Sequence, residues 1–397
     1  MQHILFQQDI AVHLFQLLIF GEMFMRLLKK IIAAAKWVLD WVRRPVSARR
    51  FTVSFVAVFG ILFLLWTLLV FWVDPYFYYH RSWGLKGVYS NPEARIAGVM
   101  RSYDFDAVLF GSSMCQNFKC SEIDAALHVK SVKATAAGMT SDMFSQYFET
   151  AWRYRGDKLT RCVLGMDILS FARGSENSNY SYLYKDRIFP WEYFYSLDTA
   201  EAIADVFITN ISAPFNRISR HQLDEDVMFS NKPRLKYSRE LVEEDVRNWS
   251  SPLILPKDRT ITINNFENHL FVHVRNHPEI QFDLFMPPYS IYFWCLLHEQ
   301  GKLEDHLELR NIFARMAAEY PNVRVYDFQA EFDIVCCFDL YKDVTHYSPD
   351  INSRIIKEIG EGKHVFSLEE FQRRTDLIRS RSEEYQPEFD KLRPKTP

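Results

Sequence analysis

The uncharged segment Phe51–Val73 limits the folds open to this chain more than any other feature of its sequence. The hydrocarbon core of a bilayer is about 30 Å thick and an α-helix rises about 1.5 Å per residue, so about 20 apolar residues cross it. Asp74 and Pro75 follow the segment, and a proline disfavours helical geometry in the residue before it. We therefore predict a transmembrane helix over residues 51–73.

The charges around this segment predict its orientation. Residues 1–50 contain eight Lys or Arg and three Asp or Glu, and basic residues favour the cytoplasmic side of a membrane. The aromatic residues Trp72 and Tyr76–Tyr79 follow the segment, as is typical of a membrane interface. We predict a basic cytoplasmic segment over residues 1–50, a juxtamembrane linker over 74–103 and an extracytoplasmic domain beyond it.

Two alternatives for Phe51–Val73 are weaker. A cleaved signal peptide needs a shorter apolar run nearer the N-terminus and a small-residue cleavage site after it. A buried core helix rarely stays uncharged for such a length. Residues 1–42 keep two interpretations: the amphipathic pattern of 26–41 favours a helix on the cytoplasmic membrane surface, and the apolar character of 10–25 leaves a second span open.

Composition disfavours two classes of function. The net charge of −3 is not that of a general nucleic-acid binder, which carries a basic surface. The six cysteines include no Cys-x-x-Cys pair, so a zinc ribbon is not expected. We predict no cofactor, no metal site and no nucleic-acid partner. A disulfide stays open, because its pairing does not follow from the sequence.

Beyond the linker, short apolar runs alternate with amphipathic segments. Five runs predict strands, at residues 105–110, 129–135, 162–166, 281–286 and 323–326. Helices are expected after Ser141, over residues 303–320 and over residues 350–359. This alternation predicts an α/β fold with a mostly parallel sheet between helices, over residues 104–366, with a helical insertion at 171–276.

The C-terminal segment, residues 367–397, is expected to hold one more helix and a tail. Ser367 and Glu370 have the spacing of a capping box, which starts a helix. The sequence from about Ser382 is highly charged, which predicts disorder.

Two short motifs contain residue types that carry acyl chemistry. Ser113 ends the motif Gly-Ser-Ser after the first predicted strand, where its hydroxyl would be exposed at the carboxyl edge of the sheet. Asp343 and His346 are three residues apart, so the carboxylate can bind imidazole Nδ1 and leave Nε2 to accept a proton. Each motif is common in surface turns, but together they supply a nucleophile, a base and an orienting acid.

These motifs resemble those of the SGNH (GDSL-type) hydrolase superfamily. The resemblance implies a three-layer, flavodoxin-like fold and a catalytic triad of Ser113, His346 and Asp343. It also implies that the backbone N–H groups of Ser113 and Gly138 bind an oxyanion, because the segment around Gly138 occupies the place of the second motif of the superfamily.

The third motif departs from the superfamily pattern. It is usually Gly-x-Asn-Asp, and here it is Gly165-Met166-Asp167, without the Asn. An ionised Asp167 cannot donate a hydrogen bond to an oxyanion, so its role stays open. Ser112 also stands where the superfamily usually has Asp.

These departures, with the single predicted span, resemble the membrane-anchored bacterial proteins of alginate O-acetylation and teichoic-acid D-alanylation. The resemblance implies a single-pass protein of the bacterial plasma membrane that acts as an esterase or O-acyltransferase on an acylated envelope polysaccharide or glycolipid. It also implies a multi-span acyltransferase as a partner. The missing Asn favours a second hypothesis, a non-catalytic carbohydrate-binding or scaffold partner of such an acyltransferase.

Two further features keep two interpretations each. His269, His273 and His277 are spaced four apart, which suits a metal ion or, more often, the polar surface of a helix. The aromatic clusters at residues 180–184 and 191–195 suit stacking on sugar rings or the core of the insertion.

Overall fold

The computed structural model describes residues 47–81, 92–173, 180–185, 187–212 and 236–393, except positions 251, 254 and 257, together with residue 85 and several positions between 29 and 40. Two compact units divide the chain, residues 1–88 with 187–218 and residues 89–186 with 219–397. The described positions between 29 and 40 are helical, and the choice between a surface helix and a second span lies outside the described residues.

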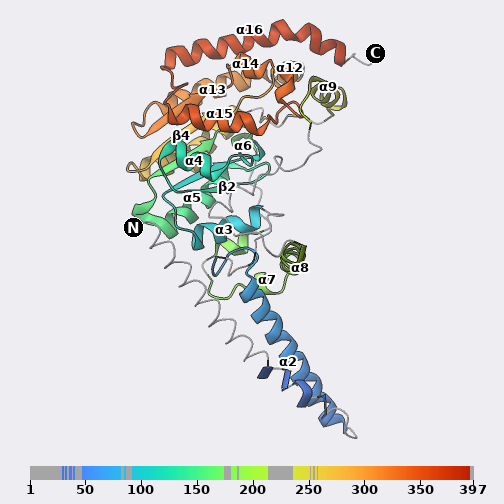
Figure 1. The fold of residues 1–397 in the computed structure, drawn as a ribbon. Helices are drawn as coiled ribbons and strands as arrows, with labels where there is room; N and C mark the ends of the chain where they lie inside the picture. The colour runs from blue at the N-terminus through green and yellow to red at the C-terminus, as the bar shows by residue number, and fades with distance from the viewer. Residues whose placement is uncertain are drawn as a thin grey trace, which may run out of the picture. The chain divides into compact units, whose positions relative to one another are not determined.

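The larger unit contains a five-stranded sheet in which every pair of neighbouring strands is parallel. Its strands are β1 (Ala107–Gly111), β2 (Ser131–Thr135), β3 (Arg161–Gly165), β4 (Gln281–Met286) and β5 (Val323–Asp327). Their order is β2-β1-β3-β4-β5, so the direction of winding reverses between β1 and β3. Figure 1 labels β2 and β4 of this sheet. The predicted α/β fold is confirmed, and such folds bind ligands at the carboxyl ends of the strands beside this reversal.

Helices cover both faces of the sheet. Successive side chains of a strand point to opposite faces: Phe110 packs on Phe144 of α5 (Ser141–Arg155), whereas Leu109 joins a buried cluster on the other face. That cluster includes residues of α4 (Cys120–Leu127), α12 (Ile291–Glu299) and α15 (Pro349–Gly360). The remaining α-helices of the larger unit, among the residues described, are α3 (Pro92–Ser102), α6 (Ile168–Ala172), α9 (Arg239–Asn248), α10 (Arg259–Phe266), α11 (Val272–Asn276), α13 (Leu303–Ala317), α14 (Phe332–Val335) and α16 (Leu368–Leu392).

Two of these helices differ from the sequence predictions. The sequence pattern does not predict α12, because residues Ile291–Leu297 are all buried and therefore show no amphipathic period. α16 continues to Leu392, so the prediction of disorder from about Ser382 is wrong. Phe389 is buried, and the Ser382 carbonyl accepts a hydrogen bond from Cys295 of α12. Packing against α12 therefore holds the charged end of the chain in a helix.

The smaller unit is built around α2 (Ala48–Val73), the one helix in the described part of the chain that is long and apolar enough to cross a membrane. It starts three residues before the predicted segment and ends at the predicted residue, Val73. Asp74 follows in a left-handed conformation, and its carboxylate accepts hydrogen bonds from the backbone N–H groups of Tyr78, Tyr79 and His80.

Part of the predicted insertion belongs to this smaller unit rather than to the sheet domain. It forms α7 (Trp191–Phe194) and α8 (Leu197–Ser212). The Tyr193 hydroxyl donates a hydrogen bond of 2.5 Å to Asp74, so the residue that ends α2 also binds α7.

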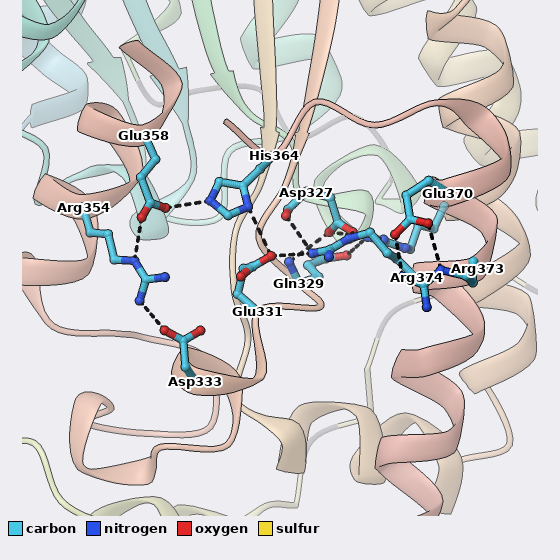
Figure 2. A network of polar contacts seen from close by, with 11 residues as sticks. Asp327, Gln329, Glu331, Asp333, Arg354, Glu358, His364, Glu370, Arg373 and Arg374 are labelled. Atoms are coloured by element: carbon cyan, nitrogen blue, oxygen red, sulfur yellow. Dashed lines mark hydrogen bonds and ion pairs between the residues drawn. The ribbon is translucent and has the colours of Figure 1, made fainter. Parts of the chain in front are cut away.

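A network of buried charges joins α16 to the edge strand β5 (Figure 2). Asp327, the last residue of β5, accepts hydrogen bonds from Arg310 of α13 and Arg374 of α16, and both Asp327 and Arg310 are fully buried. Arg374 also binds Glu331. His364 extends the network, because its Nδ1 lies 3.1 Å from Glu331 and its Nε2 lies 2.8 Å from Glu358.

The position of His364 predicts a pH dependence of stability. Burial lowers the pKa of His364, but the hydrogen bonds and charges of Glu331 and Glu358 outweigh burial, so its pKa lies above the ordinary 6.5. Such a histidine stabilises the folded state fully below about pH 6.5, and the contribution is lost as the pH rises through the higher folded pKa. We expect the difference in free energy of unfolding between wild type and His364→Gln to shrink from about pH 6 to about pH 9. Urea unfolding of the full-length protein in detergent measures it.

His298→Gln is the matched control, because His298 is exposed on α12. It measures how loss of an exposed histidine outside the network changes the free energy of unfolding over the same range. A difference for His364→Gln that stays constant with pH would contradict the assignment of this histidine to the ion network.

Candidate active site

Ser113 lies at the first turn after β1. Residues Ser113–Cys115 form a single 3-10 turn, in which Ser113 is partly accessible while Met114 and Cys115 are buried. The Met114 carbonyl accepts hydrogen bonds from the Tyr347 hydroxyl, at 3.2 Å, and from the Asn352 side-chain amide, at 3.1 Å. The turn that presents the Ser113 hydroxyl is therefore held by residues that come more than 230 positions later in the chain.

Asp343 and His346 lie on a short hairpin that is closed by an antiparallel bridge between Tyr341 and Tyr347. Inside the hairpin, Asp343 Oδ1 accepts hydrogen bonds from the backbone N–H groups of Thr345 and His346. The Asp343 carboxylate also accepts a hydrogen bond from His346 Nδ1 at 2.8 Å. Contacts inside the hairpin therefore orient the Asp343 carboxylate, without any contribution from Ser113.

The Ser113 hydroxyl and His346 Nε2 are 2.8 Å apart, although the two residues are 233 positions apart in the chain. Because Nδ1 donates to Asp343, Nε2 is the acceptor and the hydroxyl is the donor. Burial raises the pKa of Asp343, but the hydrogen bonds and charge of His346, with the charge of Lys342, outweigh burial and hold it well below its usual range. The carboxylate is therefore charged at neutral pH and stabilises an imidazolium if His346 takes the hydroxyl proton.

Asp245 of α9 is a neighbour of this pair that the sequence analysis did not identify. Its carboxylate accepts a hydrogen bond of 3.0 Å from the backbone N–H of Val344, inside the Asp343–His346 hairpin. Burial raises the pKa of Asp245, and the charge of Asp343 adds to the rise. The sequence offered no signal for it, since Asp245 is one of several acids on an amphipathic helix about 100 residues upstream.

Gly138 lies in the turn after β2, beside the Ser113 turn. The Ala136 N–H donates to the Gly111 carbonyl at 3.1 Å, which ties the two strand ends together. Gly138 has a φ of +66°, a conformation that glycine adopts without strain. Among the described residues, neither the Ser113 nor the Gly138 backbone N–H donates a hydrogen bond. Both donors are therefore available to a ligand.

Asp167 has a structural role in addition to any chemical one. It is the N-cap of α6, where it accepts hydrogen bonds from the Leu169 N–H and the Ser170 hydroxyl. Burial raises its pKa, and the Tyr289 hydroxyl and the Leu169 N–H oppose the rise. A carboxylate that accepts these bonds does not replace the amide donor of an Asn.

Arg173, directly after α6, was also not identified from the sequence. A Cβ on Gly138 would lie 3.0 Å from Arg173 Nη1, so the guanidinium covers one face of this glycine. Its charge also acts on Asp167 and lowers the pKa of that carboxyl. A cation with several N–H donors therefore lies between the second and third motifs. Arg173 is six residues past the third motif, where no pattern in the sequence marks it.

The Cys115 side chain explains two glycines at the strand ends. A Cβ on Gly111 or on Gly165 would lie 2.2 Å from Cys115 Sγ, so the sulfur fills the space between the ends of β1 and β3. Burial raises the pKa of the Cys115 thiol, and the charge of Asp167 adds to the rise. The thiol is therefore protonated and packs as an apolar group, so Ser113 is the nucleophile candidate of this turn.

The other sequence features have separate places. His269 lies 3.2 Å from Asp142, and His273 hydrogen-bonds the Ser145 hydroxyl, so these histidines face α5. No group of three or more His, Cys, Asp or Glu side chains that could hold a metal ion occurs in the described part of the chain. All six cysteines are free thiols. Of the aromatic clusters, Tyr180 and Tyr184 are buried in the larger unit, whereas Trp191 is 56% exposed in the smaller one.

Comparisons with known proteins add little to this geometry. No protein-family model matches the chain, and no curated protein matches it. Among solved structures, the chain is similar to one described as a "putative platelet activating factor" from Streptococcus pneumonia, with 9% sequence identity and a TM-score of 0.36. The similarity covers 69% of this chain and 91% of that one.

The packing of Cys115 gives a double-mutant prediction. Gly165→Ala should destabilise the protein by about 1–3 kcal/mol, because the new methyl overlaps Cys115 Sγ. Adding Cys115→Ala removes the sulfur and should recover most of this loss, measured as urea unfolding relative to Cys115→Ala alone.

Gly111→Ala is the matched control. Its methyl would also lie 2.7 Å from Cys115 Cβ, which Cys115→Ala retains, so the second substitution should not rescue it. Equal rescue of both glycine variants, or of neither, would contradict this account of the strand ends.

Proposed function

We propose that this chain is a membrane-anchored serine esterase or O-acyltransferase that works through Ser113, His346 and Asp343. One observation carries the proposal: two hydrogen bonds of 2.8 Å connect the Ser113 hydroxyl to His346 and His346 to Asp343. The connection has the donor order that a serine nucleophile needs. It lies at the carboxyl ends of parallel strands, where folds of this class bind ligands.

The proposed reaction has two steps. In the first, Ser113 Oγ attacks the carbonyl carbon of an ester while His346 Nε2 takes the hydroxyl proton, and Asp343 stabilises the imidazolium. The ester bond breaks, and His346 returns the proton to the departing alcohol, which leaves an acyl group on Ser113. In the second step, water or a sugar hydroxyl gives its proton to His346 and attacks the acyl carbon. The bond between the acyl group and Ser113 Oγ breaks, and His346 returns the proton to Oγ. Water yields a carboxylic acid, and a sugar hydroxyl yields a new ester.

The oxyanion of each step needs hydrogen-bond donors. The backbone N–H groups of Ser113 and Gly138 are two candidates, and neither donates elsewhere among the described residues. Arg173 lies against Gly138 and carries a positive charge, so we propose that its guanidinium supplies the donor that the missing Asn supplies in the SGNH pattern.

The substrate class follows from the anchor and from the family resemblance. Helix α2 is long and apolar enough to cross a membrane, and the basic residues before it favour a cytoplasmic N-terminus. We propose an acylated polysaccharide or glycolipid of the bacterial envelope as the substrate, acted on outside the plasma membrane. A multi-span acyltransferase is the proposed partner, and no step above requires a cofactor.

Labelling with a fluorophosphonate probe tests the proposed nucleophile. Full-length protein in detergent should label on Ser113, and Ser113→Ala should abolish labelling. Among the described residues, the Ser113 hydroxyl alone contacts His346 Nε2, the nitrogen opposite the one that binds Asp343; the Thr345 hydroxyl contacts Nδ1 and the Asp343 carboxylate instead. His346→Ala should slow labelling by at least about 10³-fold, since the nucleophile loses its base. Gel fluorescence and peptide mapping measure both.

Ser112→Ala is the matched control and should label normally, because, among the described residues, the hydroxyl that hydrogen-bonds His346 Nε2 is that of Ser113 and not that of Ser112. Equal labelling of wild type and Ser113→Ala would overturn the enzyme proposal. It would favour the non-catalytic carbohydrate-binding or scaffold hypothesis.

The proposed role of Arg173 gives a separate kinetic prediction. Arg173→Met should lower the rate constant of fluorophosphonate labelling by about 10²–10³-fold, because the tetrahedral adduct loses one charged donor. Arg173→Lys keeps the charge and should retain part of the rate. Quenching the labelling reaction at a series of times and reading gel fluorescence gives the rate constant for each variant. A wild-type rate in Arg173→Met, with unchanged unfolding free energy, would show that Arg173 only caps or packs.

A further inference from the structure

The smaller unit exposes apolar side chains that water does not favour. Six of them lie on or beside α7 and α8, namely Ile188 (91% exposed), Phe189 (44%), Trp191 (56%), Leu197 (82%), Ile208 (62%) and Ile211 (77%). We call these six residues the apolar face. Soluble proteins scatter such residues singly, whereas a contiguous group marks a surface that something covers.

The contacts of α7 with α2 show how deep this face lies relative to the predicted span. The ring of Tyr195, just after α7, stacks on the ring of Phe63 with centroids 4.5 Å apart. The centroid of the Trp191 ring lies 5.8 Å from the centroid of the Phe63 ring. Phe63 is about 18 Å along the helix axis from Phe51, where the uncharged run begins. A hydrocarbon core of about 30 Å therefore extends about 12 Å beyond the level of Phe63.

Hydrogen bonds at this depth have the pattern that a hydrocarbon environment demands. The Trp66 indole N–H donates to the Phe194 carbonyl at 2.7 Å, and the Thr67 hydroxyl lies 2.6 Å from the Tyr195 hydroxyl. These are the polar side chains of this part of α2, and their partners are the last residue of α7, Phe194, and the next residue, Tyr195. The Thr67 hydroxyl also contacts the Phe63 carbonyl of its own helix, at 2.9 Å. An unpaired polar group in hydrocarbon costs several kcal/mol, so such pairing is expected of a segment inside the bilayer.

Helix α8 has the pattern of a helix at the membrane interface. Five of its exposed residues, Leu197, Glu201, Ala204, Ile208 and Ile211, are spaced alternately by four and three, which forms one stripe along the helix. Asp198 is also exposed, beside the start of the stripe. The two acids, Asp198 and Glu201, lie in the N-terminal part of α8, and the other exposed residues are apolar. The Tyr76 hydroxyl donates a hydrogen bond to the Asp198 carbonyl, and the ring of Phe207 lies 6.3 Å from the ring of Trp72. Helix α8 therefore contacts α2 at the C-terminal end of α2. Glu201 can reach water at that level.

We propose that α7, α8 and the preceding loop at residues 187–190 insert into the leaflet that surrounds the C-terminal half of α2, where lipid acyl chains cover the apolar face. This inference rests on the proposed membrane span of α2, but not on the proposed enzyme activity. The occupant is lipid because the face continues the exposed apolar surface of α2, whose residues Phe55, Phe59 and Leu62 are each about 60% exposed. Two elements then anchor the chain in the membrane, α2 and the segment that contains α7 and α8. The hydrogen bond between Tyr193 and Asp74 joins them.

Spin labelling of the full-length protein in phosphatidylcholine–phosphatidylglycerol vesicles tests the proposal. Cys336 and Cys337 are first changed to Ser, because the other four cysteines are buried. Single cysteines are then introduced as Ile188→Cys and Ile211→Cys on the apolar face, with Phe59→Cys in α2 as the lipid reference and Glu244→Cys on α9 as the water reference. Oxygen, which concentrates in lipid, and a neutral nickel chelate, which stays in water, are the two collision reagents.

We expect the labels at Ile188 and Ile211 to match Phe59, with oxygen collisions exceeding nickel collisions several-fold, and Glu244 to show the reverse. Labels at Ile188 and Ile211 that match Glu244, while Phe59 stays in lipid, would overturn this inference alone. Labels shielded from both reagents would show that a second copy of the chain covers the face, and would also overturn it. A Phe59 label open to nickel would overturn the membrane span, and this inference with it.

Discussion

The carbonyl of Met114 holds the two halves of the candidate site together. It is the first carbonyl after Ser113, and it accepts hydrogen bonds from Tyr347 and Asn352. Tyr347 is the next residue after His346, so the segment that carries the base also fixes the turn that carries the nucleophile. The distance between Ser113 and His346 therefore depends on one continuous segment, the hairpin and α15, with a further contact to the hairpin from Asp245 of the insertion. A buried carbonyl without these donors would cost about 1–3 kcal/mol.

Packing between the ends of β1 and β3 also positions the turn that carries Ser113. Cys115 Sγ occupies the space that side chains at Gly111 and Gly165 would fill, and β1 and β3 approach closely because both positions lack a Cβ. Both glycines are visible in the sequence as the ends of apolar runs. Their shared cause is not, because it depends on a sulfur that the 3-10 turn folds back between the strands. The sequence pattern predicted where the two turns lie. The contact with Cys115 Sγ explains why both positions need glycine.

Sequence patterns predicted the five strands as short apolar runs, and they predicted α5 and α13 as amphipathic helices. All of these elements are present. Patterns failed for α12, which is apolar all round, and for the end of α16, whose charged residues pack against α12. They also missed Asp245 and Arg173, because each reaches the site through tertiary contacts from the insertion or from the end of a short helix.

Three aspartates at the carboxyl edge of the sheet show why partners, rather than positions, decide chemistry. Asp327 ends β5 and is neutralised by two buried arginines, so it stabilises α16. Asp167 follows β3 and caps α6, and burial raises its pKa. Asp343 alone binds a group that can exchange a proton with a nucleophile, since His346 contacts Ser113 on its other nitrogen. Only this carboxylate gains from a positive charge that forms during a reaction, and the other two are already satisfied in the resting fold.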